Sequence, residues 1–123
     1  MEGVSSTPGR LAAAARPVCP EFHEAVELIG RRWTGAILFA LGDGPLRFGE
    51  LSESVTGVSD RLLSRRLKEL EDRDIVARSV SPGTPVRVDY SLTDKGKALR
   101  PAIVELRDWA RRWNDDGRVS RSS

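Results

Sequence analysis

Residues 58–92, VSDRLLSRRLKELEDRDIVARSVSPGTPVRVDYSL, begin with a helical pattern and continue with two alternating patterns. Four leucines recur at helical spacing in the first part, between charged residues. From Val76 onward, apolar and polar residues alternate instead, on both sides of the turn-forming residues 81–85. The stretch therefore predicts an amphipathic helix over residues 59–73, followed by a two-stranded hairpin.

Apolar residues at helical spacing predict further helices on both sides of this stretch. The expected helices cover about residues 21–30, 32–41, 49–55 and 93–113. A chain break at Gly42–Pro45 separates two of them, and Leu46–Phe48 is expected to form a very short strand. Pro101 lies inside the last helix, where it removes one backbone hydrogen bond and is expected to bend the helix.

The 123 residues are expected to form one small domain with a loose segment at each end. Residues 1–18, rich in Gly, Ser, Pro and Ala, predict a flexible arm, and residues 114–123 predict a flexible tail. The domain between them, residues 19–113, is expected to be α+β and mainly helical. Its short helix, tight turn, second helix and hairpin predict a winged helix-turn-helix.

The helix over residues 59–73 carries a polar and basic face opposite its leucines. That face consists of Arg61, Ser64, Arg65, Lys68 and Asp72, and Ser59 is the expected N-cap of the helix. The first four of these side chains suit phosphate oxygens or the edge of guanine in the major groove. Apart from Asp60, the acidic residues lie in the C-terminal half, whereas the N-terminal half contacts bases in such motifs. The pattern favours a DNA-recognition helix over a charged face that is merely solvated.

The expected hairpin carries Arg78 on its first strand and Arg87 on its second. Beside a helix in the major groove, such arginines are placed for the adjacent phosphates or for a minor groove. An ordinary hairpin with solvent-facing arginines fits the same residues. The sequence leaves both interpretations open and makes Arg87 the stronger candidate of the two.

The last expected helix has an apolar stripe that is wide for so small a domain. Its proposed interface positions are Leu99, Ile103, Leu106, Trp109 and Trp113. The stripe either folds back on the first helix or packs against a second copy of the chain. DNA readers of this size usually need two-fold symmetry to cover enough bases, so the homodimer is favoured.

The composition disfavours several other classes of protein. Cys19 is the only cysteine and His23 the only histidine, so an intrachain disulfide is excluded and neither a zinc site nor any other cofactor is expected. No nucleophile or acid–base pair is evident, so an enzyme is not expected. The single cysteine and the absence of a long apolar run predict a cytoplasmic protein without a membrane partner. A winged helix used only for protein contact remains the alternative.

A series of short motifs runs in order through the domain. They are Cys19-Pro20, Leu28-Ile29-Gly30, Trp33-Thr34, Gly44-Pro45, Arg47-Phe48-Gly49-Glu50-Leu51, Gly57-Val58-Ser59, Leu63, Leu67, Glu69-Leu70-Glu71, Pro85, Arg87-Val88, Tyr90-Ser91-Leu92-Thr93 and Gly96. Each motif is weak alone, but their order and spacing are highly specific. With them, the chain from Cys19 to about Trp109 resembles the HxlR-type, MarR-like winged-helix transcriptional regulators of bacteria.

The resemblance implies a cytoplasmic homodimer that binds double-stranded operator DNA and represses, or sometimes activates, a neighbouring gene. By position, it places recognition residues at Ser59, Arg61, Ser64, Arg65 and Lys68, and a wing arginine at Arg87. Gly35 departs from the family pattern, which usually has a larger apolar residue there.

The resemblance also leaves two kinds of effector open. Cys19 matches the N-terminal cysteine with which some members sense oxidants or electrophiles, although a structural or incidental role is the favoured interpretation of this cysteine. A small-molecule pocket is the other interpretation, against simple close packing of small residues. Its candidate residues are Phe22, His23, Trp33, Gly35 and Tyr90.

Overall fold

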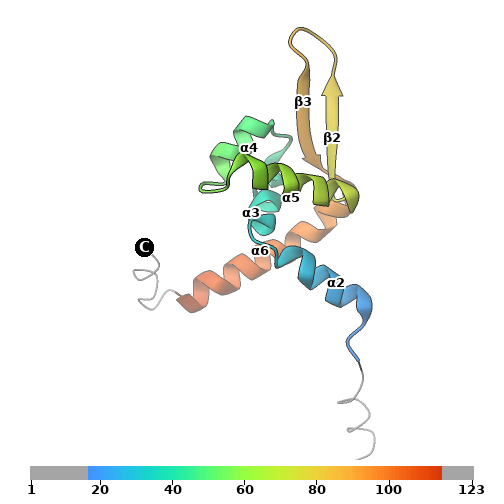
Figure 1. Cartoon of the computed structure of the whole chain (residues 1–123). Coiled ribbons are helices and arrows are strands. Elements are labelled where there is room, and N and C mark those ends of the chain that lie inside the picture. Colours follow the sequence, from blue (N-terminus) through green and yellow to red (C-terminus); the bar gives the residue numbers. More distant parts are fainter. Residues whose placement is uncertain (1–16, 115–123) are drawn as a thin grey trace, which may run out of the picture. The chain divides into compact units, whose positions relative to one another are not determined.

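The computed structural model describes residues 17–114. The chain forms two compact units, Met1–Gly30 and Arg31–Ser123. The first unit contains α2 (Pro20–Ile29). The second contains α3 (Thr34–Ala40), the 3-10 turn η1 (Leu41–Asp43), α4 (Phe48–Ser54), α5 (Asp60–Asp72), β2 (Val76–Ser81), β3 (Arg87–Leu92) and α6 (Asp94–Asn114) (Figure 1). The arm and tail predicted at residues 1–18 and 114–123 fall almost entirely outside the described residues.

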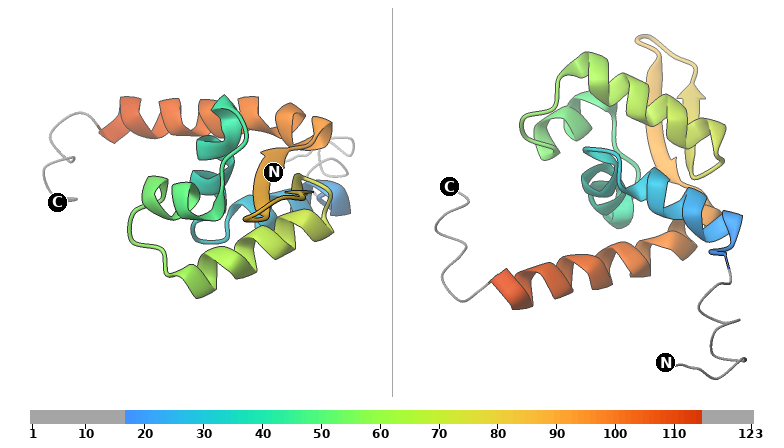
Figure 2. Two further views of the ribbon diagram at one scale, coloured as in Figure 1. Left: turned by 90° about the horizontal axis from the view of Figure 1, so that it is seen from above. Right: turned by 60° about the horizontal axis from the view of Figure 1, so that its bottom comes forward.

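The second unit is a winged helix-turn-helix, as the sequence predicted. The helix pair α4 and α5 is followed directly by an antiparallel hairpin, whose register runs from Val76 opposite Leu92 to Ser81 opposite Arg87. The hairpin projects from the C-terminal end of α5 (Figure 1). Both views in Figure 2 place α3 between α5 and α6. The α+β, mainly helical fold class is therefore confirmed.

One apolar core joins the elements of this unit. Its buried side chains are Ile37, Leu38, Leu41, Leu51, Val55, Val58, Leu63, Leu67, Leu70, Ile75, Val76, Leu92 and Ile103. Burying a side chain of this size stabilises the fold by about 1.5–3 kcal/mol. Because every element from α3 to α6 supplies at least one member, the helix-turn-helix and the wing share a single core.

Thr93 ties the start of α6 to the end of α5. Its hydroxyl donates to the carbonyl oxygen of Asp74 at 2.7 Å and accepts from the N–H of Gly96 at 3.0 Å. The second bond satisfies one of the free N–H groups at the helix N-terminus. Thr93 is thus both a helix cap and a link between two elements that are separate in sequence.

Two details differ from the sequence-based expectations. The second helix begins at Thr34 rather than near residue 32, because Trp33 adopts a left-handed backbone conformation with φ of 78°. The short strand expected at Leu46–Phe48 is reduced to one bridge, between Leu46 and Tyr90. Pro101 lies inside α6, as the sequence predicted, and the helix continues through it to Asn114. No helix within residues 17–114 is long and apolar enough to cross a membrane.

Gly96 allows α6 to approach the strand region closely. A Cβ atom at this position would collide with the carbonyl oxygen of Ile75 and would lie 3.2 Å from a side-chain carbon of Leu92. A Cβ atom at Gly35, in α3, would meet no heavy atom within 4 Å other than those of its chain neighbours and its own helix backbone. The two helical glycines therefore differ in tertiary surroundings rather than in secondary structure.

We predict that Gly96→Ala destabilises the fold by about 1–3 kcal/mol, because an added methyl group overpacks this contact. Intrinsic helix propensity alone would favour alanine by about 1 kcal/mol. Urea denaturation followed by circular dichroism measures the difference. Gly35→Ala is the matched control and should be neutral or stabilising; equal effects of both substitutions would contradict the packing argument.

Candidate nucleic-acid interface

Burial of the leucines determines which face of α5 points outward. Leu63, Leu67 and Leu70 are each at most 1% exposed, which fixes the rotation of the helix about its axis. The predicted recognition residues Ser59, Arg61, Ser64, Arg65 and Lys68 are all exposed. The structure therefore leaves all five side chains accessible to solvent.

The start of α5 is tied to both its own backbone and α4. Ser59 is the N-cap, as predicted, and its Oγ accepts the N–H of Leu62 at 3.1 Å. The hydroxyl of Ser52, in α4, donates to the Asp60 carboxylate at 3.1 Å. These bonds hold the first turn of α5, where helix-turn-helix proteins contact base edges.

The turn between α4 and α5 packs against Trp33. Gly57 has φ of +99°, which favours glycine, and the Trp33 ring lies 3.2 Å from where its Cβ would be. Val55 and Val58, on either side of Gly57, are buried. Trp33 therefore supports the turn, a role that the sequence did not suggest for it.

Arg66 connects α5 to the segment that precedes α3. Its Nε donates to the carbonyl oxygen of Arg32 at 3.0 Å, and its Nη1 lies 3.3 Å from the Glu69 carboxylate. Glu69 also lies 3.8 Å from Arg31. Only 12% of the Arg66 side chain is exposed, so this arginine is a positioning residue rather than a free DNA contact. The sequence contains a signal for this role, because Arg66 lies three residues after Leu63 and four residues before Leu70, on the buried side of the helix.

The cations of the exposed face differ in their surroundings. Lys68 pairs with Asp72 at 3.1 Å, one turn later on the same helix. Within residues 17–114, neither Arg61 nor Arg65 forms an ion pair. Unpaired positive charge is therefore concentrated in the N-terminal half of α5.

The two wing arginines lie on opposite faces of the hairpin. Arg78 is paired with Tyr90, and Arg87 is paired with Ser81. Directly paired residues point to the same face, and side chains alternate between faces along a strand. Because Ser81 is three residues after Arg78 on the same strand, Arg87 points to the face opposite that of Arg78. Both arginines are exposed, and Arg87 forms an ion pair with Asp89 at 3.2 Å. The sequence could not separate the two faces, because the register depends on where the turn begins.

The stripe on α6 divides into an inner and an outer part. Ile103 is buried within the chain's own core, and Leu99 is half-buried. Leu106, Trp109 and Trp113, spaced three and four residues apart, are 52%, 57% and 63% exposed. The outer part forms one apolar strip along the helix.

A family model described as HxlR-like helix-turn-helix matches residues 28–118. The chain belongs to this family. It is 49% identical over 98 residues to YvaP of Bacillus subtilis strain 168, an uncharacterized HTH-type transcriptional regulator, with 80% of this chain and 91% of YvaP covered. It is 45% identical over 100 residues to the HTH-type transcriptional regulator YodB of the same strain, with 81% and 89% covered.

Solved structures agree with this assignment. The reduced form of YodB from B. subtilis has a TM-score of 0.73 and 44% identity, covering 82% of this chain and 99% of that chain. The reduced form of the redox regulator HypR has a TM-score of 0.72 and 32% identity, covering 84% and 99%. This HxlR-type protein is thus a helix-turn-helix transcriptional regulator, and its family binds DNA and is not a class of enzyme.

Cys19 of this HxlR-type chain is exposed and forms the N-cap of α2. The N–H of Phe22 donates to its Sγ at 3.4 Å. Sensor thiols require access to solvent, which the exposed Cys19 side chain has. Residues 17–114 contain no cluster of three or more His, Cys, Asp or Glu side chains that could hold a metal ion.

The candidate effector-pocket residues are distributed over the two units. Phe22 and His23 lie on α2, where His23 approaches Glu27 at 3.5 Å. In the second unit, Trp33 supports the helix-turn-helix turn, and Tyr90 exchanges backbone hydrogen bonds with Leu46. A pocket in the second unit, described below, is not lined by Trp33, Gly35 or Tyr90. The effector assignment of these residues stays a prediction.

Proposed function

We propose that this regulator binds a two-fold-related operator as a homodimer and acts as a repressor. In this proposal α5 reads the major groove, and the β2–β3 wing contacts the adjacent backbone or minor groove. The observation that carries it is the exposed, unpaired basic face of α5 at Arg61 and Arg65. Operator binding would place the protein in the compartment that holds the DNA.

The chemistry of the α5 face supports direct reading of bases. A guanidinium group donates two parallel hydrogen bonds to O6 and N7 of guanine. Arg61 and Arg65 each carry such a group, and Ser64 lies between them in the sequence. Lys68 forms an ion pair with Asp72, and Arg87 forms one with Asp89. On binding DNA, each of these cations would exchange its carboxylate partner for a phosphate. This division favours base contacts from Arg61 and Arg65 and phosphate contacts from Lys68 and Arg87.

The outer strip of α6 supports the homodimer. Leu106, Trp109 and Trp113 expose a continuous apolar surface, and tryptophans are frequent anchors of protein interfaces. Two copies related by a two-fold axis would present two α5 helices to half-sites about one helical turn of DNA apart. The inner residues Leu99 and Ile103 would position the strip from within each subunit.

A second element of the proposal is release from DNA by an oxidant or electrophile at Cys19. YodB has been solved in diamide-treated and quinone-bound forms, and HypR in reduced and oxidized forms. Cys19 is exposed, so the same class of reagent can reach it. A structural role as the α2 cap is the competing explanation, and the two differ in their response to oxidants.

The recognition face is tested with an operator obtained by selection from a random duplex pool, using reduced protein. We predict enrichment of a two-fold repeat, with affinity that falls as salt rises. Arg61→Glu combined with Arg65→Glu should lower operator affinity at least about a hundredfold, because each reversal removes a contact worth about 1–3 kcal/mol and adds repulsion. Fluorescence anisotropy measures the affinity.

Arg73→Glu combined with Arg111→Glu is the control, since it makes the same charge change at two exposed positions outside the Arg61 and Arg65 face of α5. It should weaken operator binding much less. Retained affinity in the Arg61/Arg65 variant, with unchanged circular dichroism, would contradict the site assignment. Failure of the selection would instead favour a winged helix used for protein contact.

We predict that the protein is a dimer at micromolar concentration and that Trp109→Asp makes it monomeric. The substituted side chain is exposed in the single chain, so the fold should be retained. Light scattering after size exclusion measures the mass. Arg111→Asp, two residues further along α6, should remain dimeric; a monodisperse wild-type monomer would rule out the homodimer.

For Cys19, we predict that diamide oxidises the Cys19 thiols of two subunits to one intersubunit disulfide, diamide itself being reduced to the hydrazine, and that this lowers operator affinity at least about tenfold, reversibly with a reductant. Cys19→Ser should bind the operator normally and lose this response. The anisotropy assay is run on both proteins before and after diamide. Diamide-dependent release that persists in Cys19→Ser would exclude the thiol as the sensor.

A further inference from the structure

A pocket of about 700 Å³ lies within the second unit, between η1, the end of β3 and α6. Its volume falls within the usual range for small-molecule sites, about 300–1,000 Å³. Apolar walls come from Leu41, Pro45, Leu92 and Val104. The pocket is separate from the exposed α5 face, and nothing in the proposed function uses it.

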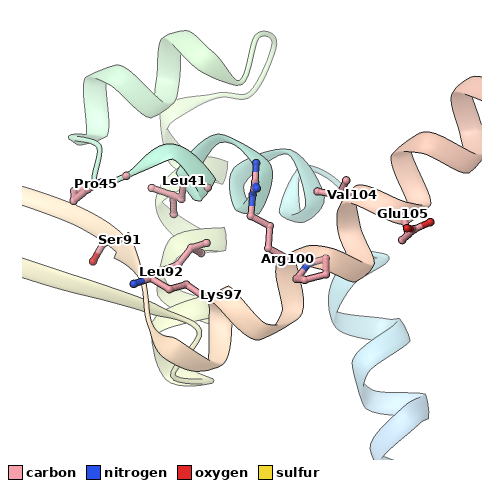
Figure 3. A pocket seen from close by; sticks show the side chains of 11 residues that line it. Leu41, Pro45, Ser91, Leu92, Lys97, Arg100, Val104 and Glu105 are labelled. Atoms are coloured by element: carbon pink, nitrogen blue, oxygen red, sulfur yellow. The ribbon is translucent and has the colours of Figure 1, made fainter.

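Two cations from one turn of α6 line this pocket. Lys97 extends toward Ser91 and Leu92, and Arg100 extends toward the segment that carries Leu41 (Figure 3). Within residues 17–114, neither cation forms an ion pair. The other cations near this part of α6 are engaged, as Arg107 is by Asp108 at 2.9 Å.

Arg100 is poorly satisfied by the protein itself. Its Nε is buried and has no hydrogen-bond partner within the described part of the chain. Its Nη2 reaches the carbonyl oxygen of Phe39 only at 3.5 Å, and its guanidinium stacks over the Phe39 ring at 5.0 Å. A half-buried cation with an unsatisfied donor is costly unless a negatively charged group completes its surroundings.

Gly42 makes this placement of Arg100 possible. A Cβ atom at Gly42 would collide with Nε and Cζ of the guanidinium. The chain at residue 42 therefore leaves space for the charged end of Arg100 in the pocket wall. The position of the half-buried guanidinium therefore depends on the absence of a side chain at residue 42 in η1.

The charges of the lining indicate which anion fits. Lys97 and Arg100 contribute two positive charges, and Glu105 contributes one negative charge further along α6 (Figure 3). A single carboxylate balances the lining, whereas a second acidic group near Glu105 would be repelled. The apolar walls require that the rest of the ligand be apolar.

We propose that this pocket binds a small organic acid, with its carboxylate on Lys97 and Arg100 and its apolar body against Leu41 and Leu92. The ligand would bridge the base of the wing and α6. The proposal does not depend on operator binding, because it concerns a site within one chain and is measured without DNA.

The test uses the ¹⁵N-labelled full chain with two probes of equal shape, 1-naphthoate and the neutral 1-naphthamide. The acid should shift the amide signals of Gly42, Gly44 and Ser91 saturably, with a Kd of about 1 mM or tighter. The amide should bind at least about tenfold more weakly, because it lacks the charge. No saturable shift at these three positions would overturn the proposal.

Lys97→Gln, at an exposed position, should raise the Kd of 1-naphthoate at least about fivefold, and Arg100→Gln by more. Lys97 provides the independent variant, because Arg100 also packs on Phe39 and its loss can perturb the fold. Arg112→Gln removes the same charge elsewhere on α6 and should change the Kd less than about twofold. Equal binding of acid and amide, or shifts centred on Trp109 and Trp113, would refute a carboxylate site here.

Discussion

Burial of the leucines of α5 is the constraint on which the rest of the structure depends. Leu63, Leu67 and Leu70 lie in the one core to which every element from α3 to α6 contributes. Since these side chains cannot leave the core without a cost of several kcal/mol, α5 cannot rotate about its axis. Its polar and basic face is consequently held toward the outside. A rigid orientation of this kind is what a helix needs in order to read base edges in a groove.

Besides its buried leucines, α5 is held in place by a few polar and aromatic contacts with neighbouring segments. Ser59 and the Ser52–Asp60 bond hold its first turn, and Arg66 holds its middle to the segment before α3. At its far end, Thr93 binds the Asp74 carbonyl oxygen and so attaches α6. The helix α5 is therefore held at both ends and in its middle, while Arg61 and Arg65 form no ion pair within residues 17–114.

The inner and outer sides of α6 have different roles. Its inner side supplies Ile103 to the core, together with Lys97 and Arg100 to the pocket beside η1 and β3. Its outer side exposes Leu106, Trp109 and Trp113. A ligand in the pocket and a partner on the outer strip would therefore act on the same helix. This arrangement gives a physical route by which occupancy of the pocket could be felt at the subunit interface and at the base of the wing.

From residue order, the helix over 59–73, the hairpin after it and the exposed polar face were all predictable, because helical and strand periodicities are local properties of the chain. The serine cap and the family resemblance were readable for the same reason. The separation of Arg78 and Arg87 to opposite faces, the anchoring role of Arg66, and the use of Trp33 against Gly57 were not. Each of these depends on strand register or on contacts between residues far apart in sequence. The cationic pocket was equally hidden, since Gly42 and Arg100 are brought together only when α6 packs against α3, and no local pattern records that approach.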